Sequence, residues 1–264
     1  MLKQRILTAM VLFILVAVVL FVLPPLGLRV AVLLLCLLTL NEIALMYKFV
    51  LLERLGVLLI FTAICLALSF VHLDYSLYIS VVSIALWCFA VPLILIFRPE
   101  RIAKMVLWLL SLALLVPAFY SFIALHELLG AWQLVSIMAI AWIADIGAYF
   151  VGRAWGKYKL APQISPGKTI EGALGGFMLT LGYLFLLKSL NVVVYLYDYR
   201  AVVKFAIILT LVSIIGDLFE SWLKRTAGVK DSGTLLPGHG GVFDRIDSLL
   251  AVVSITFVMI RGLV

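Results

Sequence analysis

Asp217 is a carboxylate inside a long apolar run, and it is the residue of this sequence that most needs a chemical explanation. A carboxylate at such a depth costs about 2.5–3.5 kcal/mol on membrane-insertion scales, so a partner should offset the cost. Glu220, Ser221 and Lys224 follow at i+3, i+4 and i+7, which places all four polar groups on one helix face. The spacing therefore predicts a polar face on an otherwise apolar helix.

Further acids lie near the ends of other apolar runs. They are Asp145, Glu171 and the i, i+3 pair Asp244 and Asp247. Hard divalent cations take oxygen ligands, and two such ions can clamp a phosphoryl transfer. We therefore expect these acids to form a cation site; for any single acid, the alternative is a neutralising pair with a nearby Lys or Arg.

A basic, glycine-rich segment, 224–241, joins two of these runs. Glycines let backbone N–H groups approach an anion, and a helix N-terminus adds a positive dipole, so the segment favours phosphate; it is also typical of a flexible turn. Within it, His239 could carry a proton, donate to phosphate or be structural. A catalytic base is the less favoured role, because a phosphomonoester with a second pKa of about 6 is already ionised near neutral pH.

The segment Ser165-Pro166-Gly167-Lys168-Thr169 is similar to the end of a P-loop. That pattern needs a glycine where this sequence has Pro162, and we expect no preceding strand. A P-loop NTPase is therefore excluded. Ser165 or Thr169 can instead cap a helix, with Pro166 near its first turn. Lys168 is then either an interfacial lysine or a phosphate ligand.

The composition shows what kind of structure must position these groups. Of the 264 residues, 66% are apolar and 12% are charged, which excludes a soluble enzyme, a disordered chain and a disulfide scaffold. The three cysteines lie in apolar runs without CxxC spacing and are expected to be packing residues. We predict an all-α, polytopic integral membrane protein.

Nine apolar runs are expected to be transmembrane helices. They cover residues 6–23, 28–47, 55–71, 76–97, 103–125, 131–151, 170–190, 201–222 and 244–264. Residues 1–130 form the expected scaffold, with possible roles in dimer or lipid contacts. Residues 131–264 form the catalytic region with its polar loops 152–169 and 223–243.

The basic residues predict the orientation. If the loops alternate between two sides, the side of the N-terminus holds 15 of the 20 Lys and Arg residues. Loops rich in Lys and Arg stay in the cytoplasm, so the N-terminus and both polar loops are expected there. This topology and a phosphate-binding face account for the net charge of +7 without nucleic acid as a partner.

Residues 221–247 resemble the signature of phosphatidate cytidylyltransferases, also called CDP-diacylglycerol synthases. The matching blocks read Ser221-Trp222-Leu223-Lys224-Arg225, Lys230-Asp231-Ser232-Gly233 and Leu236-Pro237-Gly238-His239-Gly240-Gly241-Val242-Phe243-Asp244-Arg245-Ile246-Asp247. No position in this stretch departs from the pattern. The blocks Ala144–Tyr149 and Ser165–Thr169 also resemble the family, so the resemblance covers about residues 141–248.

The resemblance implies that CTP and phosphatidate react to give CDP-diacylglycerol and diphosphate. It also implies Mg²⁺, a second cation that is either divalent or K⁺, a homodimer, and a site facing the cytoplasm in a bacterial inner membrane. The lipid phosphate would attack the α-phosphorus of CTP, and catalysis would consist of positioning and charge stabilisation.

On this hypothesis each polar residue receives a role. Catalytic roles fall to Asp217, Lys230, Asp231, Asp244, Arg245 and Asp247. Substrate-binding roles fall to Asp145, Ser165, Lys168, Thr169, Ser221, Lys224, Arg225, His239, Gly240 and Gly241. The expected metal ligands are Asp217, Asp231, Asp244 and Asp247.

Two other functions fit parts of the pattern. A CTP-dependent polyprenol or dolichol kinase would transfer the γ-phosphate instead. An ion-coupled transporter would use the buried acids to carry Na⁺ or protons, although its acids are expected at the membrane midplane and not near one face.

Overall fold

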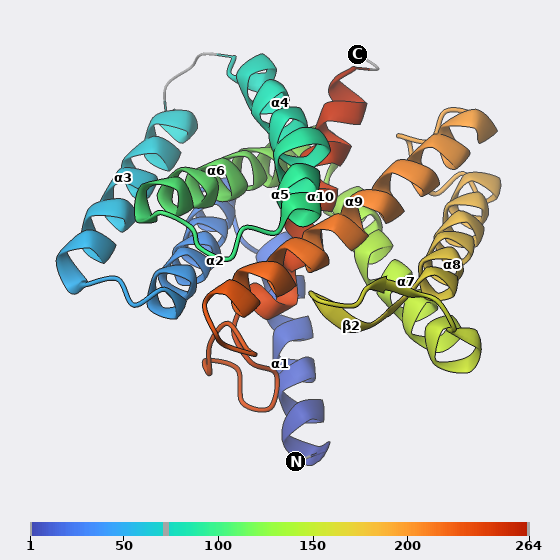
Figure 1. Cartoon of the computed structure of the whole chain (residues 1–264). Coiled ribbons are helices and arrows are strands. Elements are labelled where there is room, and N and C mark those ends of the chain that lie inside the picture. Colours follow the sequence, from blue (N-terminus) through green and yellow to red (C-terminus); the bar gives the residue numbers. More distant parts are fainter. Residues whose placement is uncertain (1, 71–73, 263–264) are drawn as a thin grey trace.

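The computed structural model describes residues 2–70 and 74–262, and most of them are helical. The first half contains α1 (Leu2–Phe21), α2 (Pro25–Met46), α3 (Leu51–Phe70), α4 (Ser76–Ile84), the π-helix η1 (Ala85–Ala90), α5 (Val91–Phe97) and α6 (Lys104–Leu129). The second half contains α7 (Ala131–Trp155), β1 (Lys159–Ala161), β2 (Ser165–Thr169), α8 (Ile170–Ser189), α9 (Tyr199–Thr226) and α10 (Phe243–Arg261). The helical class is confirmed, with one short β-hairpin added (Figure 1).

Seven helical segments of the described chain are long and apolar enough to cross a membrane. They are α2, α3, the continuous segment Ser76–Phe97, α6, α7, α8 and α9. The apolar part of α1, Ile6–Phe21, is shorter, and α10 carries three charged residues near its start. Nine spans therefore remain a prediction, although every predicted span is helical over its described residues apart from one or two at the ends of some spans. The break at His72 and the ends of the third and ninth predicted spans, 71 and 263–264, lie outside the described residues.

Ion pairs between distant segments agree with the predicted alternation of sides. They are Arg29–Glu127 (2.7 Å), Lys104–Glu53 (2.8 Å) and Arg261–Asp74 (2.6 Å), and each joins two segments assigned to the same side. Figure 1 shows the start of α1 and the loop between α9 and α10 at the lower end of the molecule, and the end of α10 at the upper end. This arrangement is consistent with an odd number of crossings.

The helices α7 and α8 pack closely because glycines remove side chains from their interface. A Cβ built on Gly176 would lie 2.7 Å from the carbonyl oxygen of Ala144, and one on Gly147 would lie 2.7 Å from the carbonyl oxygen of Gly175. Backbone atoms cannot move aside as a flexible side chain can. The close contact therefore fixes α8 against α7, and with it the hairpin that precedes α8.

Gly176→Ala is expected to destabilise the protein by about 1–3 kcal/mol, because the new methyl group meets a backbone carbonyl. Gly182→Ala on the same helix is the matched control, because a methyl group added at Gly182 would have no atom within 4 Å. The control should be neutral or stabilising, because alanine favours a helix more than glycine does. Thermal unfolding in detergent measures both, and equal melting temperatures would contradict the packing argument.

The polar loop 152–169 contains a hairpin that was not predicted from the sequence. Strands β1 and β2 are antiparallel, with Lys159 opposite Thr169 and Ala161 opposite Ser165. A strand does precede Ser165, and Pro166 lies in β2 instead of the first helical turn, so both expectations were wrong. The P-loop remains excluded by Pro162. The cap of α8 is Thr169, whose Oγ1 accepts a hydrogen bond from the Gly172 amide at 3.1 Å.

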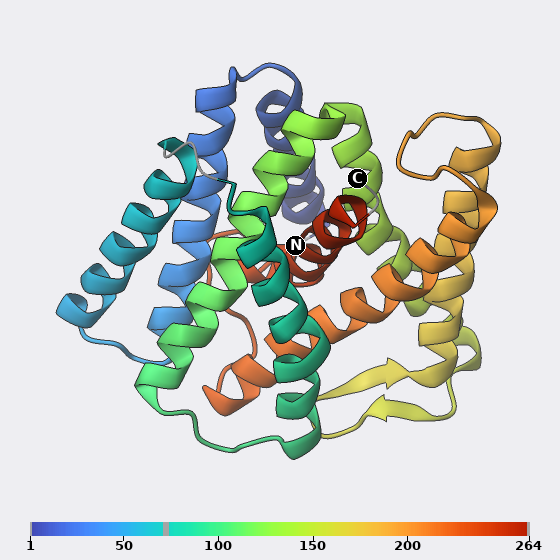
Figure 2. The same cartoon turned by 90° about the horizontal axis from the view of Figure 1, so that it is seen from above.

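The hairpin extends from the start of α8 to the end of α5 (Figure 2). At its tip, the Arg98 guanidinium donates a hydrogen bond to the Gln163 side chain. Strand β2 also contacts α9. These contacts at both ends hold Lys168, which lies near the end of β2, beside the polar face of α9.

The two halves share one core. The helix α10 packs against α2, α4 and α6 of the first half as well as α7 and α9 of the second. Behind the polar face of α9, the π-helix places Trp87, only 1% exposed, edge-on to Phe219 with ring centres 6.3 Å apart. Pro92 has no N–H to donate and follows directly, which accounts for the widened turn. The first half therefore supports the polar groups directly.

Candidate active site

Three carboxylates from α9 and α10 form a cluster suited to a cation. Asp217, Glu220 and Asp247 each offer an oxygen, and these oxygens all lie within 4.8 Å of one another. Glu220 is only 2% exposed, and its Oε1 has no hydrogen-bond partner among the described residues. Three acids therefore converge around a buried oxygen that has no partner. Such a set of oxygen donors suits a hard cation.

Lysines partly neutralise this cluster from two directions. Lys168 of the hairpin lies 2.7 Å from Asp217, and Lys224 lies 2.6 Å from Glu220. The charges of Asp217 and Lys168 also act on Asp145 of α7, and the Ser221 hydroxyl donates to Asp217 at 3.3 Å. The expected convergence of acids is present for α9 and α10; Asp145 of α7 and Glu171 of α8 are not among the three clustered acids.

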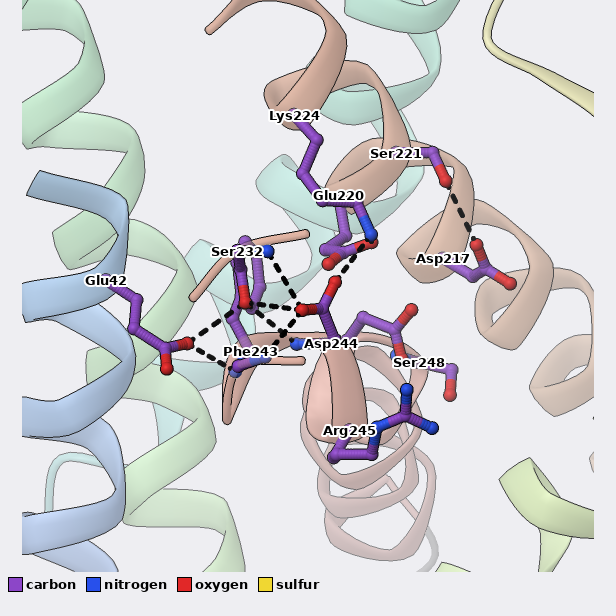
Figure 3. Close-up of polar contacts among 12 residues, drawn as sticks. Glu42, Asp217, Glu220, Ser221, Lys224, Ser232, Phe243, Asp244, Arg245 and Ser248 are labelled. Atoms are coloured by element: carbon purple, nitrogen blue, oxygen red, sulfur yellow. Dashed lines mark hydrogen bonds and ion pairs between the residues drawn. The ribbon is translucent and has the colours of Figure 1, made fainter. Parts of the chain in front are cut away.

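Asp244 is not one of the three acids of this cluster, although it shares Lys224 with Glu220 and is one turn from Asp247. Its Oδ1 accepts from the Lys224 ammonium at 2.6 Å. Its Oδ2 accepts from the backbone amides of Ser232 (2.9 Å) and Gly241 (2.8 Å) (Figure 3). Asp244 therefore joins the loop to α9, and its expected role as a metal ligand stays a prediction.

The N–H groups at the start of α10 are already bonded within the protein. Glu42, from α2, accepts from the amides of Val242 and Phe243, both at 2.9 Å, and Figure 3 shows the contact with Phe243. The Asp244 amide donates to the Ser232 hydroxyl at 3.3 Å. Carboxylates and a hydroxyl of the chain therefore occupy these donors in this structure, and the expected phosphate contacts of the helix N-terminus and the Gly241 amide stay a prediction.

The loop before α10 instead encloses a polar pocket of about 580 Å³. Lys230, Thr234, His239 and Arg245 are among the residues that line it. The Arg245 side chain donates to the His239 carbonyl oxygen at 3.0 Å, and His239 Nδ1 is buried with no partner in the described chain. Basic and neutral donors around one hollow suit a polyanion such as a nucleotide phosphate chain.

The remaining predicted residues are spread around these features. Asp231 and Gly240 line the polar pocket, so Asp231 is not part of the three-acid cluster. Arg225 is exposed at the end of α9, and Ser165 lies in β2. Glu171 accepts from the Tyr158 amide at 3.2 Å and does not join the other acids.

Sequence reasoning missed Glu42 and gave Glu220 no place among the metal ligands. The i+3 spacing from Asp217 was the available signal for Glu220. For Glu42 there was none, because an acid near the end of an apolar run also fits an ordinary interfacial charge, and its partners lie 190 to 201 residues away.

Comparison with known proteins shows the family of the chain. The cytidylyltransferase family model matches residues 3–263. The chain belongs to the cytidylyltransferase family. The match covers the helices of the first half as well as the polar region, so it includes Glu42 and every residue of the site.

Several curated relatives of this cytidylyltransferase-family chain are named phosphatidate cytidylyltransferase. The Haemophilus influenzae protein is 48% identical over 126 residues, covering 47% of this chain and 44% of the relative. The Thermotoga maritima protein is 38% identical over 160 residues (57% and 58%), and the Pseudomonas aeruginosa protein 42% over 147 residues (55% and 54%). The chain spans about half the length of the curated relatives it matches.

Proposed function

We propose that this protein transfers the cytidylyl group of CTP to phosphatidate, forming CDP-diacylglycerol and diphosphate for phospholipid synthesis. The observation that carries the proposal is the cluster of Asp217, Glu220 and Asp247. The neighbouring loop forms the polar pocket described above, called the basic pocket from here on, and both lie in a chain of apolar helices. The family and the names of the relatives support the same reaction.

The reaction balances without an added base. An oxygen of the phosphatidate phosphate bonds to the α-phosphorus of CTP, and the bond from that phosphorus to the bridging oxygen breaks, so diphosphate leaves. The phosphomonoester is already largely ionised, because its second pKa is about 6. The chain therefore has to bring two polyanions together and orient them.

The acid cluster would hold Mg²⁺, with Asp217, Glu220 and Asp247 as ligands. When bound, the cation supplies positive charge that screens the two polyanions and the leaving diphosphate. Lys168 and Lys224 hold the carboxylates in place. A second cation, divalent or K⁺, with Asp231 or Asp244 among its ligands, remains part of the proposal.

The basic pocket would hold the phosphates of CTP. Lys230 and Arg245 supply charge, and the unpartnered His239 Nδ1 supplies a further polar atom. Arg245 is oriented by its hydrogen bond to the His239 carbonyl. This pocket takes over the role first assigned to the helix N-terminus.

A lipid substrate is supported by a groove on the outer face of α7 and α8. Gly147, Phe150, Leu174 and Met178 are among its lining residues, and its volume is about 710 Å³. Apolar walls with glycines at the base suit an acyl chain. We further propose a bacterial inner membrane, a cytoplasmic site, the bilayer as partner and a homodimer.

Lys168→Ala should raise the apparent KM for CTP or phosphatidate by roughly 10- to 100-fold, because Asp217 loses a charged partner 2.7 Å away. Lys159→Ala is the matched control, because Lys159 is the exposed residue of β1. Thr169, not Lys168, caps α8. Thr169→Val therefore removes the helix cap but keeps the charge of Lys168, whereas Lys168→Ala removes the charge but keeps the cap. Steady-state kinetics measure this. An unchanged KM in Lys168→Ala would show that Lys168 is an interfacial lysine and not a phosphate ligand.

Labelled CTP separates this reaction from its alternatives. With purified protein, phosphatidate and Mg²⁺, label at the α-phosphorus should enter the lipid, whereas a lipid kinase would transfer only label at the γ-phosphorus. Nucleotide-independent counterflow of Na⁺ or protons in liposomes, without lipid labelling, would favour the transporter.

A further inference from the structure

Both ends of the pocket loop converge on one carboxylate of the first half. Glu42 Oε1 accepts from the Val242 amide, and Oε2 accepts from the Phe243 amide. The Ser232 hydroxyl, at the other end of the loop, lies 3.0 Å from Glu42 Oε2. The loop between them, 233–241, supplies most of the lining of the basic pocket.

Glycines bring the loop close enough for these contacts. A Cβ on Gly233 would lie 2.7 Å from Glu42 Oε1, and so would one on Gly241. Any larger residue at either position would have to displace the carboxylate. The two glycines thus make room for Glu42 at both ends of the loop.

The carboxylate is buried, at 6% exposure, and forms no ion pair with any described residue. Its compensation comes from amide donors at the start of α10, where the helix dipole is positive. Such a group is expensive to bury unless its hydrogen bonds are complete. Its burial is therefore compensated only while both ends of the loop are in place.

Ser232 carries the connection onward to the second carboxylate. Its hydroxyl hydrogen lies within reach of both Glu42 Oε2 and Asp244 Oδ2, the latter at 2.9 Å. Asp244 in turn bonds Lys224, which pairs with Glu220 of the acid cluster. A chain of contacts therefore runs from α2 to the cation ligands.

We infer that Glu42 is a positioning residue that fixes both ends of the 232–243 loop and so shapes the pocket for the phosphates of CTP. It touches neither substrate in this scheme. The claim that the pocket binds CTP rests on the proposed function. The claim that Glu42 fixes the loop does not.

Glu42→Gln tests the inference, because an amide keeps the size of the side chain but turns one acceptor into a donor facing another donor. We expect the apparent KM for CTP to rise about tenfold or more, with the KM for phosphatidate changed by less than about twofold. Hydrogen exchange of the 232–243 peptides should rise in the same variant. Glu53→Gln, in an exposed pair with Lys104, is the matched control and should change neither.

Tyr47→Phe separates positioning from general stability. Tyr47 lies just beyond α2, and its hydroxyl contacts the Leu223 carbonyl (3.1 Å) and the Thr226 hydroxyl (2.6 Å), so its loss loosens α2 from α9 without touching the loop. The KM for CTP should stay unchanged in Tyr47→Phe. Equal rises in KM and loop exchange in Tyr47→Phe and Glu42→Gln would overturn the inference.

Ser232→Ala gives a second route if Glu42→Gln does not fold. It removes the bridging hydroxyl and leaves the bonds from Val242 and Phe243, so exchange should rise at 232–234 more than at 242–243. Unchanged loop exchange in both Ser232→Ala and a folded Glu42→Gln would overturn the inference even if CTP proved not to be the substrate. Absence of label transfer in the unmodified protein, with loop exchange still raised in Glu42→Gln, would contradict the proposed function alone.

Discussion

Asp217→Asn is expected to lower kcat by about 1,000-fold or more at any Mg²⁺ concentration while leaving the protein folded in detergent. The variant removes one of three carboxylates whose oxygens lie within 4.8 Å of one another. It also leaves Lys168 without its ion-pair partner. Loss of an electrostatic group acting on the transition state commonly costs about 100- to 1,000-fold, and loss of a metal ligand adds weaker binding to this.

Asp74→Asn is the matched control for this substitution. Asp74 pairs with Arg261 in an exposed position on the other side of the molecule, so its loss should leave kcat unchanged. Kinetics across a Mg²⁺ series, together with a melting curve, separates a lost cation site from lost folding. Near-normal activity of Asp217→Asn at any Mg²⁺ concentration would contradict the metal assignment.

Asp244→Asn is expected to lower kcat/KM for CTP by about 100-fold or more, and for a different reason. The amide would turn a donor toward either Lys224 or the amides of Ser232 and Gly241, so the link between α9 and the loop breaks. Breaking a buried charged network by removing one partner typically costs about 3–5 kcal/mol.

The two variants should differ in their response to Mg²⁺. In Asp244→Asn the Mg²⁺ concentration for half-maximal activity should stay close to that of the unmodified protein, because Asp244 lies outside the three-acid cluster. Gly240→Ala should resemble Asp244→Asn, because its methyl group would lie 2.6 Å from Asp244 Oδ2. A large shift of the Mg²⁺ requirement in Asp244→Asn would instead make Asp244 a ligand.

The helices and the main acids could be predicted because local patterns carry them. Apolar runs indicate helices wherever they occur, and the i, i+3 spacing placed Asp217 and Glu220 on one face. The same spacing did not place Asp244 and Asp247 together in the three-acid cluster. Although they share a face of α10, Asp244 accepts from Lys224 and the loop, while Asp247 meets Asp217 and Glu220. Side-chain direction at a helix start depends on the neighbours, which spacing does not contain.

The missed features depend on tertiary contacts. The hairpin strands have three and five residues, and the second reads Ser-Pro-Gly-Lys-Thr, which has little of the β-branched alternation typical of strands. The role of Glu42 depends on a loop about 190 residues later in the chain. The helix N-terminus was expected to be free for phosphate, because a sequence does not reveal which carboxylate already occupies it.

The most direct test of the account measures both products of the reaction in one assay. Purified protein in detergent, with phosphatidate and Mg²⁺, is given CTP labelled at the α-phosphorus, and labelled lipid and diphosphate are counted together, in parallel with Asp217→Asn. We expect one diphosphate released for each labelled lipid in the unmodified protein, and neither product in the variant. Lipid labelled only from the γ-phosphorus, or equal turnover in Asp217→Asn, would contradict it.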